Sequence, residues 1–101
     1  MQTTINKNRK PTHGGAILRE DMLPALKITQ GELAVKLGAS RRTISEILYE
    51  KRPITADMAI RIAKFTNTTP QSWLNIQQML DIWQLQQTRA NAYAQIERVA
   101  A

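Results

Sequence analysis

The chain has 101 residues, a formal net charge of +6 and an isoelectric point near 10.2. This length corresponds to one domain with a modest core. The chain has no cysteine, which excludes disulfides and thiolate metal sites and suits a reducing compartment. No apolar run approaches the roughly 20 residues of a membrane span, and the N-terminus lacks the apolar segment of a secretory signal. We therefore expect a cytoplasmic protein.

The positive charge is concentrated in the middle of the chain. The basic residues between positions 36 and 64 are Lys36, Arg41, Arg42, Lys51, Arg52, Arg61 and Lys64, and the acidic ones are Glu46, Glu50 and Asp57. A clustered basic patch is typical of a protein with a polyanion partner. Basic charge by itself is weak support, because many basic proteins bind nothing anionic.

Residues 1–12 are polar, show no helical periodicity and contain Pro11, so we expect a flexible arm. From Gly14 onward the spacing of apolar residues predicts a helix, which we expect Pro24 to end. Its apolar residues are Ile17, Leu18, Met22 and Leu23.

A second helix has clear start and stop signals. Thr29 and Glu32 have the spacing of a capping box, and Ile28 and Leu33 have that of a hydrophobic staple across it. Gly38 is suited to the left-handed conformation that ends a helix. The inward-facing residues are expected to be Leu33, Ala34 and Leu37.

A third helix is predicted to start after the cap residue Ser40 and to end at Lys51-Arg52-Pro53. Apolar residues recur at i, i+3 and i+4, which predicts one buried face. That face consists of Ile44, Ile47 and Leu48, and the opposite face of Arg41, Arg42, Thr43, Ser45 and Glu46.

Two further helices follow. Thr55 is expected to cap the fourth helix, with Asp57 in its first turn, and Thr69 to cap the fifth, with Pro70 at its first position. The fourth helix has the apolar stripe Met58, Ala59, Ile62, Ala63 and Phe65; the fifth has Trp73, Leu74, Ile76, Leu80 and Trp83 and runs to about Gln87.

No segment alternates with period two, so the sequence predicts an all-α fold with roughly five helices. Residues 13–87 form the expected domain. Residues 88–101 form a tail that extends the last helix or adds a short one, with Ile96 and Val99 as weak anchors.

The second and third predicted helices together meet the requirements of a helix-turn-helix. Their steep crossing needs a small residue at closest approach, which Ala34 provides, and a turn residue that tolerates positive φ, which Gly38 provides. Because these requirements agree in one place, the segment predicts a DNA-binding motif whose polar helix enters the major groove.

The segment resembles the helix-turn-helix of the phage-repressor (Cro/C1, or Xre) family in the motif Gln30-x-x-Leu33-Ala34-x-x-Leu37-Gly38-Ala39-Ser40-Arg41-x-x-Ile44-Ser45. A wider pattern is similar to the HigA antitoxins, also called VapI-like proteins. It consists of Gly14-Gly15-x-Ile17-Leu18-Arg19-Glu20, of Arg52-Pro53-Ile54-Thr55-Ala56-Asp57-x-Ala59-x-Arg61-Ile62-Ala63, and of Thr69-Pro70-x-x-Trp73-Leu74-Asn75-Ile76-Gln77. The resemblance covers about Thr12 to Gln84; the chain departs from it with His13-Gly14-Gly15, where the family often has Pro-Gly.

This resemblance implies a five-helix, lambda-repressor-like domain that binds a palindromic operator in its own promoter as a homodimer. It also implies a small partner, a HigB-type ribonuclease toxin that the chain neutralises. Two alternatives remain: a module that mainly sequesters the toxin, and a stand-alone Xre-type regulator with no toxin.

The candidate DNA-binding residues are Gln30, Ser40, Arg41, Arg42, Thr43, Ser45, Glu46, Lys51 and Arg52. Gln30 matches the glutamine with which the family contacts a phosphate. An arginine can bond guanine O6 and N7 bidentately, but the sequence does not say which arginine does so. Glu46 is suited either to accept a bond from a cytosine amine or to pair with Arg42 at i, i+4.

We expect structural roles, and no role in catalysis, for the tryptophans and the single histidine. We expect Trp73 in the core, and Trp83 with Met79 at a dimer seam that Tyr93 also suits. His13 is the only histidine and has no acidic cluster beside it, so we expect no metal site. No nucleophile–base set is recognisable, so we expect no enzyme activity, cofactor or small-molecule substrate.

Overall fold

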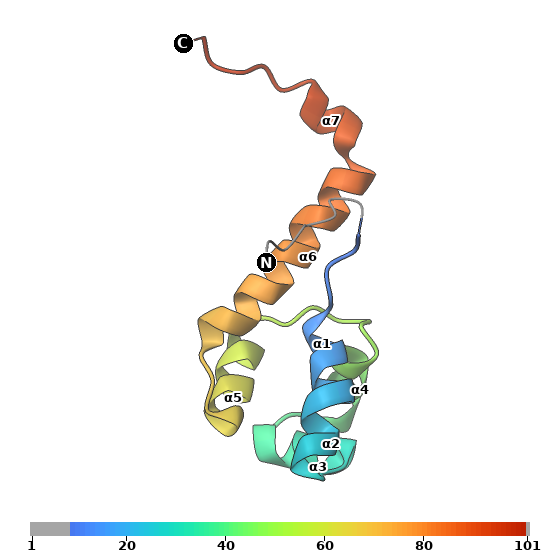
Figure 1. Ribbon diagram of the computed structural model, residues 1–101, viewed down its shortest axis with the longest axis vertical. Coiled ribbons are helices and arrows are strands. Elements are labelled where there is room, and N and C mark those ends of the chain that lie inside the picture. Colours follow the sequence, from blue (N-terminus) through green and yellow to red (C-terminus); the bar gives the residue numbers. More distant parts are fainter. Residues whose placement is uncertain (1–8, 101) are drawn as a thin grey trace, which may run out of the picture.

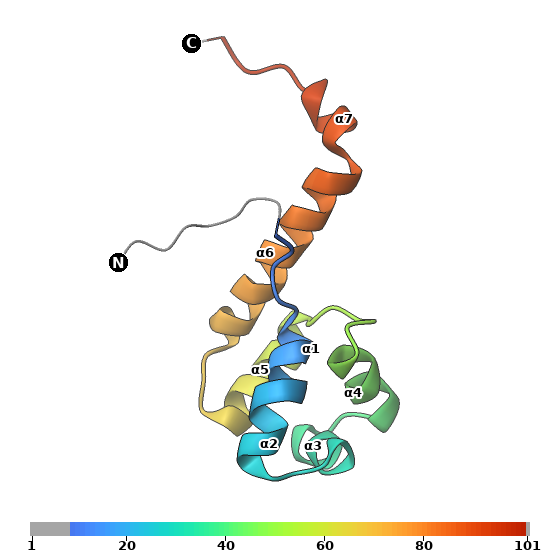
Figure 2. The same cartoon turned by 45° about the vertical axis from the view of Figure 1, so that its right-hand side comes forward.

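In the computed structural model, which describes residues 9–100, every regular element is helical. The elements are α1 (Gly14–Ile17), the π-helical segment η1 (Leu18–Met22), α2 (Leu23–Leu26), α3 (Gln30–Leu37), α4 (Arg41–Leu48), α5 (Ala56–Thr66), α6 (Pro70–Thr88) and α7 (Ala90–Ala94). Figures 1 and 2 show a bundle of α1 to α5, from which α6 extends toward α7. The expected all-α fold is confirmed; the expected arm falls mainly on residues 1–8, outside the described residues.

Pro24 does not end the first helical stretch, so this prediction is wrong. The stretch continues through α2 to Leu26 and ends at Lys27, whose φ of 55° is left-handed. The π-helical segment ends at Met22, two residues before Pro24, and the Leu23 N–H bonds the Leu18 carbonyl five residues back. A proline ring crowds the carbonyl four residues before it in an α-helix. We attribute the wider turn to the relief of that crowding.

The predicted start and end of α3 are confirmed. The Glu32 N–H donates to Thr29 Oγ1 at 3.1 Å, and the Thr29 N–H donates to Glu32 Oε1 at 3.1 Å, which completes the capping box. Gly38 then has a φ of 66°. Arg61 was not anticipated here: its Nη1 donates to the carbonyl oxygens of Leu37 and Gly38 at 2.9 and 3.2 Å, which satisfies acceptors at the end of the helix.

The end of α4 comes earlier than predicted. The helix stops at Leu48, before the expected Lys51-Arg52-Pro53, and Glu50 takes a left-handed φ of 64°. The chain then runs without regular structure to Thr55, whose hydroxyl accepts from the Met58 N–H at 3.3 Å and caps α5. Both Thr55 and the later cap residue Thr69 act as predicted.

The core is formed by the buried faces of α3 to α6, by Leu18 of η1 and by Ile54 in the loop before α5. It contains Leu18, Leu33, Ala34, Leu37, Ile44, Ile47, Leu48, Ile54, Met58, Ala59, Ile62, Ala63 and Trp73. The partly buried residues packed against it include Ile17, Met22, Leu23, Ile28, Phe65, Leu74 and Ile76. Trp73 also donates from Nε1 to Thr68 Oγ1 at 2.8 Å, so its expected place in the core is confirmed.

Gln77 is a buried polar residue within the apolar stripe of α6 and was not anticipated. Its Oε1 accepts from the Ile54 N–H at 2.8 Å, and its Nε2 donates to Asp81 Oδ1 at 2.9 Å. The side chain thereby fastens the loop before α5 to α6.

Replacing Gln77 with leucine is expected to cost about 1–3 kcal/mol of folding free energy, because the buried Ile54 N–H would lose its acceptor. Urea unfolding measures this loss. The matched control Gln78→Leu changes an exposed neighbour on the same helix and should leave the stability nearly unchanged. Equal effects of the two substitutions would contradict the role of the Gln77–Ile54 bond.

The C-terminal tail adds a short helix rather than extending α6. The chain leaves helical geometry at Arg89, where φ is −123° and ψ is 24°, and α7 follows. Ile96 and Val99 are 72% and 88% exposed, so neither anchors the tail to the domain, contrary to expectation.

Candidate nucleic-acid interface

The two faces of α4 separate as the sequence predicts. Ile44, Ile47 and Leu48 are at most 2% exposed, whereas Arg41 and Arg42 lie in solvent. The side chain of Arg42 is 88% exposed. The apolar face holds the helix against α1 and α3 and leaves its polar face on the outside of the bundle.

The N-terminus of α4 is closed by a pair of hydroxyls. Ser40 Oγ accepts from the Thr43 N–H at 3.1 Å and donates to Thr43 Oγ1 at 2.9 Å. The Ser40 proton is therefore used within the cap. The Thr43 proton is left to donate, which suits a phosphate oxygen better than a thymine methyl group.

Arg41 lies against the first turn of α3. A Cβ built on Gly31 would lie 3.3 Å from Arg41 Nη2 and 3.5 Å from its Nε. The structure thus brings Arg41 beside the helix turn that begins with Gln30, which is half-buried. A guanidinium and the positive end of a helix dipole both attract anions, so this corner is suited to a phosphate.

Glu46 bridges two arginines of the same surface. Its Oε1 lies 2.9 Å from Arg52 Nη2 and 3.6 Å from Arg42 Nε. The pairing with Arg42 agrees with one of the two alternatives open from the sequence, whereas the closer pairing with Arg52 was not anticipated. Ser45 beside it is half-buried, and Lys51 is exposed.

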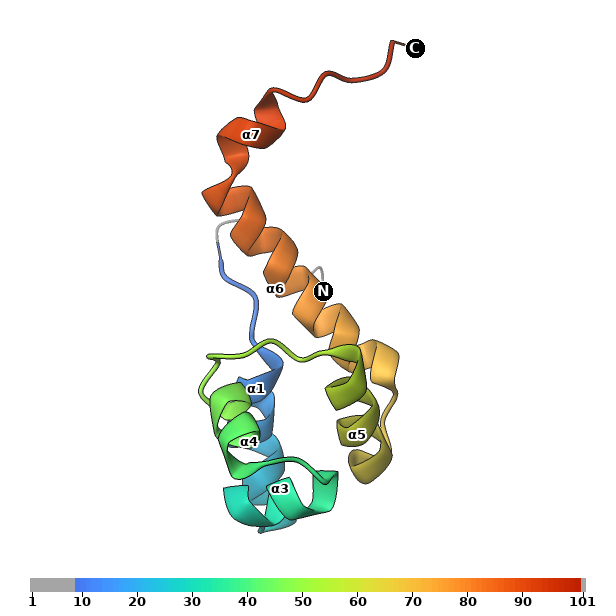
Figure 3. The same cartoon turned by 180° about the vertical axis from the view of Figure 1, so that it is seen from behind.

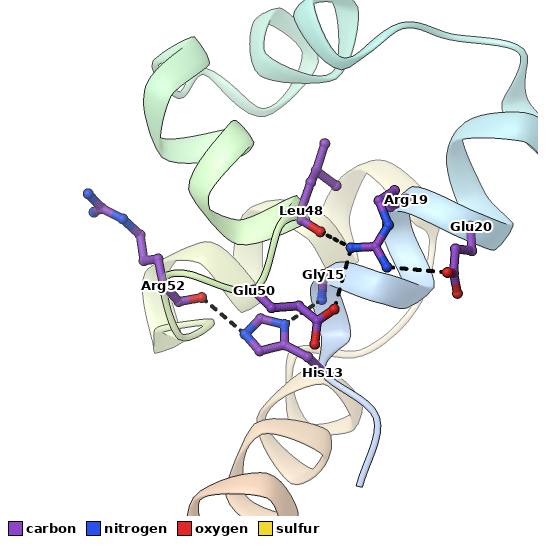
Figure 4. Close-up of polar contacts among 7 residues, drawn as sticks. All are labelled: His13, Gly15, Arg19, Glu20, Leu48, Glu50 and Arg52. Atoms are coloured by element: carbon purple, nitrogen blue, oxygen red, sulfur yellow. Dashed lines mark hydrogen bonds and ion pairs between the residues drawn. The ribbon is translucent and has the colours of Figure 1, made fainter. Parts of the chain in front are cut away.

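His13 is buried and links α1 to the loop after α4 by two hydrogen bonds (Figure 4). Its Nδ1 accepts from the Gly15 N–H at 2.8 Å. The ring proton is therefore on Nε2, which donates to the Arg52 carbonyl at 3.1 Å. The histidine caps α1 and holds the backbone of Arg52 in place. The sequence did not predict this role, because it depends on a contact between residues 39 positions apart.

Arg19 secures the C-terminal end of α4 in the same view (Figure 4). Its Nη1 donates to the Leu48 carbonyl and lies 3.5 Å from Glu50 Oε2, and its guanidinium lies over the Tyr49 ring at 5.9 Å. The hydrogen bond to Glu20, with the nearby charges of Glu20 and Glu50, raises the pKa of Arg19 above its ordinary value. The guanidinium remains a fixed cation.

The second half of α6 exposes apolar side chains outside the bundle. Met79, Ile82 and Leu85 are 60%, 48% and 43% exposed, and Trp83 is half-buried. An open hollow on this helix is lined by Asp81, Trp83, Gln84, Leu85, Gln87 and Thr88. Tyr93 in α7 is 41% exposed.

Within residues 9–100, no helix has the length and apolar content needed to cross a membrane. Among the same residues, no three histidine, cysteine or acidic side chains gather as the ligands of a metal ion would.

Two packed helices, α3 and α4, that are joined by a glycine turn and leave the polar face of the second on the outside define the helix-turn-helix class. Residues 18–73 match the helix-turn-helix family, and the chain belongs to this family, in its Xre (Cro/C1) type. It is 41% identical over 81 residues to an uncharacterized HTH-type transcriptional regulator of Haemophilus influenzae, covering 80% of this chain and 76% of that one. It is 36% identical to antitoxin HigA-1 of Vibrio cholerae over 74% of this chain and 70% of that one.

A solved structure shows the same fold. The Pseudomonas aeruginosa antitoxin HigA, solved with the higBA promoter, superimposes with a TM-score of 0.84 at 33% identity. The match covers 90% of this chain and 100% of that one. The expected similarity to HigA antitoxins is confirmed.

Proposed function

We propose that the protein is a sequence-specific DNA-binding repressor that acts as a HigA-like antitoxin and regulates its own operon. The observation that carries this proposal is the orientation of α4, whose apolar side is buried while Arg41 and Arg42 project outward. The relatives named as regulators and antitoxins, one of them solved with promoter DNA, support the same function.

The DNA contacts divide between the phosphate backbone and the bases. Arg41 with Gln30 is suited to a phosphate beside α3, while Arg42, in the middle of the exposed face, is suited to a base edge. Lys51 and Arg52 follow the helix and are suited to flanking phosphates. The other proposed contact residues are Ser40, Thr43, Ser45 and Glu46.

The proposed assembly on DNA is a homodimer. Two copies of α4 related by a twofold axis would enter successive major grooves about 34 Å apart on a palindromic operator. Met79, Ile82 and Trp83 follow i, i+3, i+4 spacing on the part of α6 that leaves the bundle, so a second copy would bury a continuous apolar stripe there.

The proposed protein partner is a HigB-type ribonuclease toxin. This step depends on the likeness to the HigA antitoxin of Vibrio cholerae. The alternative is a stand-alone Xre-type regulator, which the likeness to the uncharacterized regulator of Haemophilus influenzae supports equally. The two functions share the same DNA surface and differ only in whether a second protein binds.

Binding of the protein to labelled DNA from its own upstream region tests the repressor function. Fluorescence anisotropy should show a complex that survives competition by unrelated DNA and weakens steeply as salt rises, since lysine and arginine contacts to phosphate release counterions. A folded dimer that binds its upstream region no better than a scrambled duplex would overturn the proposal.

Co-expression with the product of the neighbouring gene tests the antitoxin function separately. We expect the two proteins to co-purify and the ribonuclease activity of the partner to be suppressed. Operator binding without any association at micromolar concentration would leave the stand-alone regulator as the function.

A further inference from the structure

One carboxylate oxygen holds two of the cations on the proposed DNA surface. Glu46 Oε1 pairs with Arg52 at 2.9 Å and with Arg42 at 3.6 Å. The side chain of Glu46 is only 28% exposed, whereas that of Asp57 in the other i, i+4 ion pair, with Arg61, is 72% exposed. Water therefore screens the Glu46 pairs less.

Arg52 is held at both ends of the residue. Its backbone carbonyl accepts from His13 Nε2 at 3.1 Å, and its guanidinium donates to Glu46 Oε1 at 2.9 Å. In Figure 4 the Arg52 side chain points away from the histidine, so the two contacts act on opposite sides of the residue. The guanidinium is thus positioned before any DNA arrives.

An acidic side chain on a DNA-binding surface weakens binding, because it repels the phosphates. A phosphate that takes Arg52 must separate it from Glu46 and leave a half-buried carboxylate facing a polyanion. The backbone of any DNA offers nothing that compensates the carboxylate. A base with an amine N–H in the major groove compensates the carboxylate, because Glu46 can accept a hydrogen bond from that amine.

We propose that Glu46 is a positioning residue that determines specificity: by holding Arg52 it lowers the affinity for DNA of unrelated sequence more than the affinity for the operator. This inference rests on the proposed DNA-binding function. It assigns to Glu46 the discrimination between sequences and to Arg52 the contact through which Glu46 acts.

The test compares Glu46→Gln with Asp57→Asn on a scrambled duplex of the same length and composition as the upstream fragment. Both variants remove one negative charge and one 2.9 Å ion pair with an arginine, but Glu46→Gln also removes the 3.6 Å pair with Arg42, and only Glu46 lies on the proposed DNA surface. We expect Glu46→Gln to bind the scrambled duplex fivefold to tenfold more tightly, and the slope of log K against log salt to steepen by about 0.9 for each additional phosphate that the variant neutralises. Asp57→Asn should change neither quantity by more than about twofold.

Adding Arg52→Gln to Glu46→Gln should abolish the tighter binding, since the released guanidinium makes the new phosphate contact. An equal change in both single variants would mean that net charge alone acts and would overturn the assignment. Tighter binding that persists without Arg52 would overturn the role of Arg52.

The scrambled-duplex comparison keeps this inference separate from the function on which it rests. If the wild-type protein shows no preference for its upstream region, the repressor function fails, and the ratio between the Glu46 and Asp57 variants is still measured. If the wild type prefers the operator but Glu46→Gln retains that preference in full, only the inference fails.

Discussion

Replacing Gly15 with alanine is expected to destabilise the domain by about 3 kcal/mol or more. A Cβ at this position would lie 1.8 Å from the Ile47 carbonyl oxygen and 2.8 Å from its carbonyl carbon. Backbone atoms cannot rotate away as a side chain can, so α1 and α4 would have to separate. Ile47 is 2% exposed in the core, and the shift would open the packing on both sides.

The loss is large relative to the about 5–15 kcal/mol that typically separates folded from unfolded domains. Urea unfolding should show a lower midpoint, and the melting temperature should fall by roughly 10 °C or more. Operator binding should fail near the new melting temperature because α4 loses its support.

Gly31→Ala is the matched control for this prediction. The three atoms nearest to the same methyl group at Gly31 all belong to the Arg41 guanidinium, the closest at 3.3 Å, and a flexible arginine can move. Alanine is also the better helix former, so the change in stability should stay within about 1 kcal/mol. A Gly15→Ala variant as stable as Gly31→Ala would show that the close approach of α1 to α4 is wrong.

Local patterns in the sequence were sufficient for the caps and for the inward faces of the helices. A capping box spans four neighbouring residues, and a buried stripe repeats within one helix, so Thr29 with Glu32 and Ile44 with Ile47 are recognisable without a structure. Pro24 misled the prediction because a π-helical turn ahead of the proline lets the helix continue past it, and a proline in the sequence does not by itself distinguish this outcome from a helix end.

Contacts between distant segments could not be predicted in the same way. The bonds of His13 to the Arg52 carbonyl, of Gln77 to the Ile54 N–H and of Arg61 to the Leu37 carbonyl join residues 39, 23 and 24 positions apart. Each becomes visible only when the helices are packed. For Gln77 the sequence did offer a signal, since a polar residue inside an apolar stripe indicates a buried hydrogen bond.

For the candidate site, the sequence was sufficient to say which side chains lie on the outer face of α4, but not how they pair. The i, i+4 spacing of Arg42 and Glu46 suggested one ion pair. The closer partner, Arg52, reaches Glu46 only because α4 ends at Leu48 and the chain turns back at Glu50. The geometry of a loop thus decides which of the two arginines lies closer to the carboxylate.

The double substitution Arg41→Ala, Arg42→Ala is expected to weaken operator binding by about 2 kcal/mol or more, since one good arginine contact to a base contributes roughly 1–3 kcal/mol. The melting temperature should change little, because both side chains lie outside the core and Arg42 is 88% exposed. Anisotropy titration and thermal unfolding of the same samples measure the two quantities. A large fall in melting temperature would show that the faces of α4 are assigned wrongly.

The control for this prediction removes the same charge elsewhere. Lys64 on α5 and Arg98 in the tail are both exposed, and α5 lies across the bundle from α4 (Figures 1 and 3). Lys64→Ala with Arg98→Ala lowers the net charge by as much as the Arg41 and Arg42 pair does, so it controls for the loss of two positive charges. The control should keep most of its preference for the operator over a scrambled duplex. The Arg41 and Arg42 variant should lose that preference, because base contacts, unlike phosphate contacts, distinguish one sequence from another.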